Sequence, residues 1–106
     1  MKKLVSALAI AGLAGFAAAP ASAQNVDELL KKYACLSCHA VDKKLVGPSY
    51  KDVAAKYAGQ SDAAAALAGK VKKGGQGVWG PIPMPPNPTV PDGDLQAMVK
   101  YILSVK

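Results

Sequence analysis

Five consecutive residues, Cys35-Leu36-Ser37-Cys38-His39, place two thiols and an imidazole at a fixed spacing. The C-x-x-C-H pattern is typical of covalent haem attachment, because each thiol can bond a porphyrin side chain and the adjacent histidine can ligate the iron. Both cysteines of the chain and its one histidine lie in this segment. The segment therefore predicts a single cofactor, one covalently attached haem c.

An iron held by His39 on one side needs a second axial ligand, or keeps an open position, on the other side. The candidate ligands are the methionines, Met1, Met84 and Met98. Met84 stands among prolines that fix its backbone, so a weak thioether–iron bond would cost less entropy there. Met98 lies on the apolar face of a predicted helix, where methionine usually belongs to the core. We predict that His39 and Met84 are the axial ligands and that Met98 is a core residue.

Four short helices are predicted around this site, over residues 26–34, 48–57, 61–73 and from 92 or 94 to the C-terminal end. Each shows apolar side chains at helical spacing. Pro48 is expected to open the second helix and Ser61 to cap the third. The expected buried stripe of the third helix is Ala64, Leu67, Ala68 and Val71. With no strand pattern, we expect an all-α fold of about four short helices wrapped around the haem.

The segment over residues 74–91 joins the last two predicted helices and is rich in glycine and proline. Its five closely spaced prolines are Pro81, Pro83, Pro85, Pro86 and Pro88. Proline removes a backbone donor and fixes φ, so neither a helix nor a central strand can form there. We expect a stiff, extended loop.

Residues 1–23 have the pattern of an export signal that is cleaved. Two lysines precede an apolar run over residues 4–19, and Ala21-Ser22-Ala23 is a small-residue cleavage site. An uncleaved membrane anchor is the alternative, although the run is short for a membrane span. We expect one domain over residues 24–106, in the periplasm and with no stable membrane insertion. A domain of this size needs help to build its core, and a haem supplies an apolar centre.

The chain is basic, with 13 lysines, no arginine, 7 acidic residues and a formal charge of +6 at pH 7. Without the two lysines of the leader, the formal charge is +4. Dispersed lysines without a basic stripe argue against a nucleic-acid partner for an exported protein. They fit either docking to an acidic patch on a redox partner or an ordinary solvated surface.

Three segments occur in an order and spacing typical of one protein family: Cys35-Leu36-Ser37-Cys38-His39, Val46-Gly47-Pro48-Ser49-Tyr50 and Gly77-Val78-Trp79-Gly80-Pro81-Ile82-Pro83-Met84-Pro85-Pro86-Asn87. Through them, residues 24–106 closely resemble the small bacterial class I cytochromes c-551/c-552, also called cytochrome c8. The resemblance implies the small cytochrome c fold. It also implies that His39 and Met84 are the axial iron ligands, that Cys35 and Cys38 are the thioether attachments, and that the Pro48 carbonyl accepts the other ring N–H of His39.

Two further roles follow from the resemblance. Trp79 would donate its indole N–H to a haem propionate, and the Asn87 side chain would lie beside the Met84 sulfur. The structural alternatives are a core aromatic residue and a turn residue. The chain departs from the family pattern at Lys70, where an arginine often neutralises a propionate, and at Tyr101, where a tryptophan is frequent.

Two strong axial ligands leave no place at the iron for substrate or oxygen, so we predict a carrier of single electrons and not an enzyme. We expect a monomer, the default for a shuttle of this size. By the same resemblance, it would shuttle between a membrane quinol-oxidising complex and a terminal reductase, such as a nitrite reductase, or an oxidase. Val46, Val78 and Ile82 are candidates for an apolar rim around an exposed haem edge, with lysines outside the rim. The competing classes are a haem enzyme or gas sensor with an open iron position, a thiol–disulfide protein and a zinc site.

Overall fold

The structure, a computed structural model, describes residues 25–106, so the predicted leader lies outside the described residues. The helices are α1 (Val26–Lys32), the short 3-10 helix η1 (Cys35–Ser37), α2 (Tyr50–Tyr57), α3 (Ala63–Lys73) and α4 (Asp92–Ser104). Over residues 25–106 there is no strand, and the only bridges are two isolated pairs, His39 with Lys44 and Gly75 with Met84. The prediction of four α-helices is confirmed.

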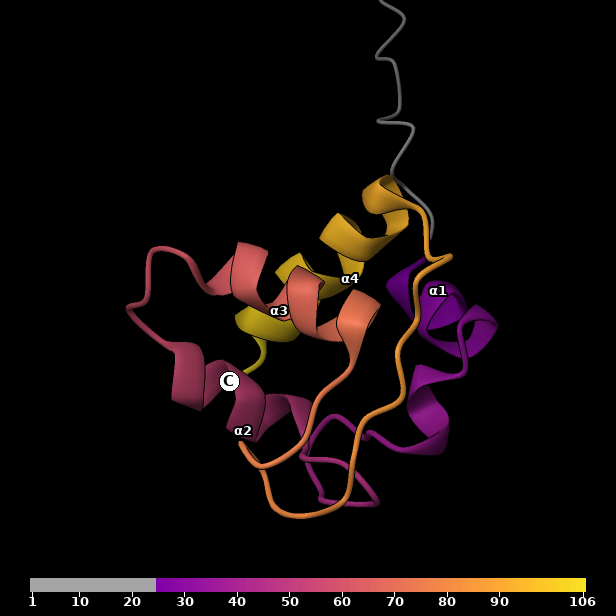
Figure 1. The fold of residues 1–106 in the computed structure, drawn as a ribbon. Coiled ribbons are helices and arrows are strands. Elements are labelled where there is room, and N and C mark those ends of the chain that lie inside the picture. The colour runs from indigo at the N-terminus through magenta and orange to yellow at the C-terminus, as the bar shows by residue number, and fades with distance from the viewer. Residues whose placement is uncertain (1–24) are drawn as a thin grey trace, which may run out of the picture.

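The C-terminal helix α4 organises the core, because α1, α2 and α3 all pack against it (Figure 1). Its apolar stripe follows the helical period and supplies three buried side chains, Leu95, Met98 and Val99. They form one cluster with four others, Leu29, Leu30, Tyr50 and Val90. Met98 is 2% exposed, which confirms the prediction that it is a core residue.

Two predicted helix starts are wrong. Ser49, and not Pro48, marks the beginning of α2, where its Oγ accepts a hydrogen bond from the Asp52 N–H at 3.1 Å. This side-chain cap satisfies an N–H that has no partner within the helix, and Pro48 remains outside the helix. Its carbonyl is then available to the site described below.

The predicted cap of the third helix, Ser61, is also wrong, because Asp62 precedes α3 and makes no side-chain cap. The Ala63 N–H bonds the Gln60 carbonyl at 3.3 Å, and this turn carries the chain into the helix at Ala63. The buried face also differs from the predicted one. Ala63 is buried and Ala64 is exposed, contrary to the predicted stripe, whereas Leu67, Ala68 and Val71 pack against the core as expected.

The first helix ends two residues earlier than predicted, at Lys32. Tyr33 caps it, and Ala34 then adopts a left-handed conformation with φ of 59°. This residue reverses the chain direction directly before η1, so Cys35 begins a separate turn of helix instead of ending α1. The reversal brings the attachment segment against the core.

The proline-rich segment is an extended loop, as predicted. In Figure 1 it descends from the end of α3, turns at the lower edge of the molecule and returns past α1 to the start of α4. Val90, 4% exposed, anchors its end in the core. Within residues 25–106, no helix has both the length and the apolar character needed to cross a bilayer.

Candidate haem-binding site

The two cysteines lie on one tight turn. The Cys38 and His39 N–H groups both bond the Cys35 carbonyl, at 3.2 and 3.0 Å, which closes the turn around η1. Both thiols are half-buried and neither forms a disulfide. Burial raises the pKa of the Cys35 thiol, so it is held as the neutral SH group at neutral pH. Both sulfurs are available to bond a group beside them.

The His39 ring is oriented by a backbone carbonyl. Its Nδ1 lies 2.8 Å from the Pro48 oxygen, and because that oxygen can only accept, Nδ1 carries the proton. The lone pair of Nε2 is then free to ligate a metal. The ring also stacks on Tyr50, with centroids 5.3 Å apart and an angle of 20° between the planes.

Two adjoining cavities, of about 230 and 200 Å³, open beside this ring. The residues that line both are Cys38, His39, Tyr50, Val71, Met84, Pro85, Val99 and Ile102. Most of these side chains are apolar, and they come from α2, α3, α4, the proline loop and the two residues that directly follow η1. The two cavities thus form one apolar slot that has His39 and Met84 among its walls.

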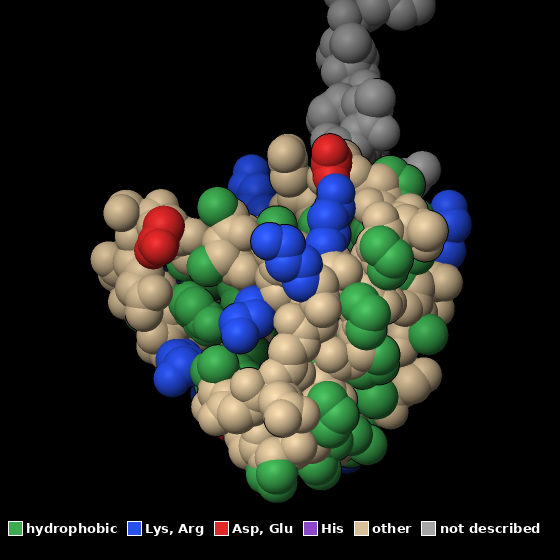
Figure 2. Space-filling model, in the orientation of Figure 1, with side chains coloured by type: hydrophobic (Ala, Val, Ile, Leu, Met, Phe, Trp, Pro, Cys, Tyr) green, Lys and Arg blue, Asp and Glu red, His purple; other side chains and the backbone are tan. Residues whose placement is uncertain are grey.

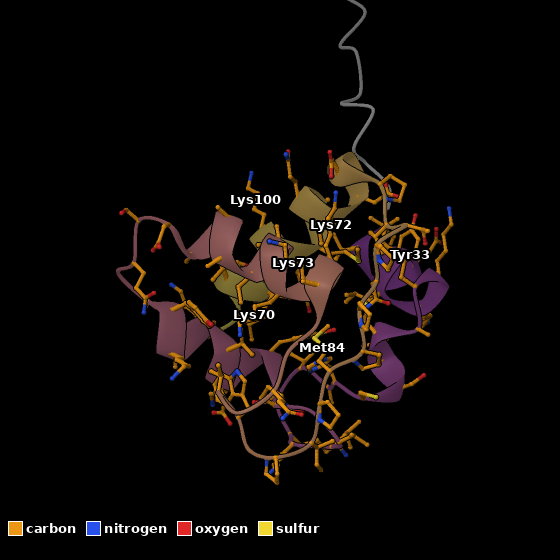
Figure 3. All side chains as sticks on the ribbon, viewed as in Figure 1. Tyr33, Lys70, Lys72, Lys73, Met84 and Lys100 are labelled. Atoms are coloured by element: carbon orange, nitrogen blue, oxygen red, sulfur yellow. The ribbon has the colours of Figure 1, made fainter. Side chains whose placement is uncertain are left out.

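Met84 enters this slot from the proline loop, between the loop and α3 (Figure 3). Its backbone is held by a reciprocal pair of hydrogen bonds with Gly75, N–H to carbonyl, at 2.7 and 3.1 Å. Gly74 permits this approach, since its φ is +69° and a Cβ there would overlap the Met84 carbonyl oxygen. The thioether is therefore presented by a backbone that has little freedom.

Trp79 and Asn87 also lie at the slot. Trp79 lines the larger cavity, is 41% exposed, and has the Lys56 Nζ 5.4 Å from its ring centroid. Asn87 lines the smaller cavity together with Met84, and its Nδ2 donates to the Pro85 carbonyl at 3.1 Å. The side-chain amide thus orders the loop that carries Met84.

A family model for cytochrome c matches residues 23–106. The chain belongs to the cytochrome c family. It is 56% identical to cytochrome c-551 of Pseudomonas aeruginosa over 84 residues, which cover 79% of this chain and 80% of that protein. It is 47% identical to cytochrome c-552 of Hydrogenobacter thermophilus over 106 residues and the whole of both chains. The crystal structure of Nitrosomonas europaea cytochrome c552 superposes with a TM-score of 0.72 at 55% identity, covering 76% of this chain and 99% of that one.

These relatives confirm the predicted family, the small cytochrome c fold and the cofactor, one covalently bound haem c. The residues of this cytochrome fit that group. An imidazole and a thioether are a common axial pair for haem iron, and both line the same apolar slot. The two cysteines stand beside it on one turn, where each sulfur can bond the porphyrin.

The cytochrome also contains site features that the sequence pattern did not reveal. A Cβ on Gly47 would lie 2.6 Å from the His39 Cε1, so this position must stay a glycine for the ring to sit where it does. Lys70, which stands where the family often has an arginine, lines the larger cavity. The sequence signal for Gly47 is its position directly before Pro48, but the distance to the ring depends on the fold.

Proposed function

We propose that this protein is a periplasmic carrier of single electrons in which His39 and Met84 ligate the haem iron from opposite sides. The observation that carries the proposal is that both side chains line the same slot and both are held by the backbone. His39 is held through the Pro48 carbonyl, and Met84 through its hydrogen bonds with Gly75. Such fixed donors need to move little when the charge of the iron changes.

The bound haem supplies an iron that takes up and releases one electron as it cycles between the ferric and ferrous states. With His39 and Met84 both ligating, no position is open for substrate or oxygen, which favours a carrier over an enzyme or gas sensor. The thioether also favours the ferrous state relative to more basic ligands, so it raises the reduction potential. Cys35 and Cys38 keep the cofactor in place covalently.

We assign supporting roles to three other residues. The Pro48 carbonyl keeps the His39 ring in one tautomer and makes it a better donor. Trp79, at the edge of the larger cavity, donates its indole N–H to a haem propionate. Asn87 orders the loop and lies beside the Met84 sulfur.

The partners are redox proteins, donors and acceptors, that approach the exposed side of the slot. Val46, Val78 and Ile82 line the larger cavity and are 52%, 43% and 61% exposed, which supports their role as an apolar rim. Figure 2 shows hydrophobic side chains gathered along the lower edge of this face, with lysines above them. We assign a membrane quinol-oxidising complex as the donor and a terminal reductase, such as a nitrite reductase, or an oxidase as the acceptor. The mature chain, residues 24–106, acts as a monomer after export.

Carbon monoxide tests the proposed ligation. The wild-type holoprotein should show six-coordinate, low-spin spectra in both oxidation states, and carbon monoxide should leave the ferrous spectrum unchanged at neutral pH. Met84→Ala should open one position and bind carbon monoxide readily. Met98→Leu, which alters the other methionine of the mature chain and keeps the core apolar, should behave as the wild type. Ready binding of carbon monoxide by the wild type would favour the enzyme or sensor.

The mass of the peptide that contains Cys35 and Cys38 tests the attachment. A covalent adduct of haem mass is expected on this peptide. A free dithiol, a disulfide or a zinc adduct would contradict the proposal and would favour the competing classes.

A further inference from the structure

The His39 ring has two close neighbours besides the Pro48 carbonyl. The Tyr50 ring stacks on it, nearly parallel, at a centroid distance of 5.3 Å. Gly47 lies against the ring at Cε1, where an added Cβ would sit over the ring atoms, 2.6 Å from Cε1, 3.0 Å from Nδ1 and 3.2 Å from Nε2. The hydrogen bond fixes one ring atom, and the contacts with Tyr50 and Gly47 limit rotation and tilt of the ring.

Both neighbours are themselves immobilised. Tyr50 is 3% exposed and belongs to the main core cluster. Its N–H bonds the Ala40 carbonyl at 2.9 Å, and the Gly47 N–H bonds the Cys38 carbonyl at 2.7 Å. With the His39 to Pro48 bond between them, these contacts join residues 38–40 to residues 47–50 along their length.

We propose that Tyr50 and Gly47 are positioning residues that set the plane of the His39 imidazole. Tyr50 holds one face by offset stacking, which is the favoured arrangement for two rings at this separation. Gly47 has no side chain, so its backbone can lie against the ring at Cε1, where a Cβ would overlap the ring atoms. The inference rests on the proposed function, because the orientation of the ring acts on the haem only if His39 ligates the iron.

Proton NMR of the ferric holoprotein reports the orientation of the imidazole plane, which together with the orientation of the Met84 sulfur sets the order and spread of the haem methyl resonances. Tyr50→Leu removes the stacking ring, and the added methyl group of Gly47→Ala would overlap the ring at Cε1. Each variant should change this pattern. Tyr50→Phe keeps the ring and should retain it. Leu29→Ala provides the control for general destabilisation, since Leu29 is 3% exposed in the same core and does not line either cavity.

A wild-type pattern in both Tyr50→Leu and Gly47→Ala would overturn the inference, as would an equal change in Leu29→Ala. The ferrous wild-type protein gives a second measurement that needs no variant. Nuclear Overhauser effects between the Tyr50 and His39 ring protons are expected, and their absence would also overturn it. Failure of the proposed function can be distinguished from failure of this inference. It would appear as carbon monoxide binding by the wild type, and this result does not depend on the contacts of the His39 ring.

Discussion

Gly74 shows how a single residue controls the presentation of Met84. Its φ of +69° suits glycine, and a Cβ at this position would overlap the Met84 carbonyl oxygen and crowd the Pro86 nitrogen at 2.9 Å. These neighbours are backbone atoms, so they cannot move aside as a flexible side chain would. Any larger residue would therefore shift the loop that carries the thioether.

We expect Gly74→Ala to lower the free energy of unfolding of the holoprotein by about 2–4 kcal/mol, from backbone strain and steric overlap together. Gly59→Ala is the matched control, since Gly59 has φ of +78° but no atom within 4 Å of the added carbon. It should lose about 1 kcal/mol, the cost of the left-handed conformation. Chemical denaturation measures both, and equal losses would show that the contact with Met84 is unimportant.

At the scale of elements, the junction between α1 and η1 decides how the attachment turn meets the core. Ala34 provides the reversal there with φ of 59°, a region that disfavours residues with a Cβ. Tyr33, next to it, donates its hydroxyl to Asp94 of α4 at 2.6 Å. Ala34 is therefore strained, and the hydrogen bond of Tyr33 holds the junction against α4.

Ala34→Gly should stabilise the protein by about 0.5–1 kcal/mol, because the relief of strain exceeds the entropy lost by a more flexible unfolded chain. Ala55→Gly, at an exposed position inside α2, should have the opposite sign and cost about 1 kcal/mol. Thermal or chemical unfolding of the two variants compares them directly. A destabilised Ala34→Gly variant would contradict the assigned strain.

The bond between Tyr33 and Asp94 should make stability depend on alkaline pH. The hydrogen bond to Asp94, with burial and the carboxylate charge, raises the pKa of Tyr33 above its ordinary value of 10.0. A raised folded-state pKa contributes stability that is fully present below pH 10 and is lost as the pH rises through the folded value. The wild type should therefore lose more stability than Tyr33→Phe above pH 10. Parallel curves of unfolding free energy against pH would exclude this coupling.

At the scale of the molecule, the lysines should steer partners to one face. Lys70, Lys72 and Lys73 on α3 and Lys100 on α4 lie on the same face in Figure 3. Lys72 pairs with Asp92, and Lys70 lines the larger cavity. The face that borders the slot is therefore positively charged.

Electron transfer to an acidic redox partner should slow several-fold as ionic strength rises from about 0.01 to 0.15 M, because the screening length falls from about 30 to about 8 Å. Stopped-flow kinetics measures the rate. Neutralising Lys73 and Lys100 with glutamine should flatten this dependence more than neutralising Lys31 and Lys32 on α1. Electron-transfer rates that do not change with ionic strength would show that the lysines are an ordinary solvated surface.

The sequence by itself determined the cofactor, the number of helices and the stiff loop with its methionine. Each depends on residues close together in the chain: thioether chemistry on the Cys35 to His39 segment, helices on local periodicity, and the loop on its prolines. The first residues of the helices were less predictable. Ser49 and Asp62 directly precede α2 and α3, and the turns that lead into these helices depend on how the whole chain folds.

The tertiary structure alone decided the contacts between distant segments. Three such contacts have no local sequence pattern: Gly47 against the His39 ring, Gly74 against the Met84 backbone, and the bond from Tyr33 to Asp94, 61 residues apart. Glycine, tyrosine and aspartate are common in turns and helices, so their presence in the sequence does not reveal these contacts. The contacts become visible only when the fold brings the partners close together. The physical reason is that steric exclusion and hydrogen bonding act over a few ångströms in space, and the fold decides which residues come that near.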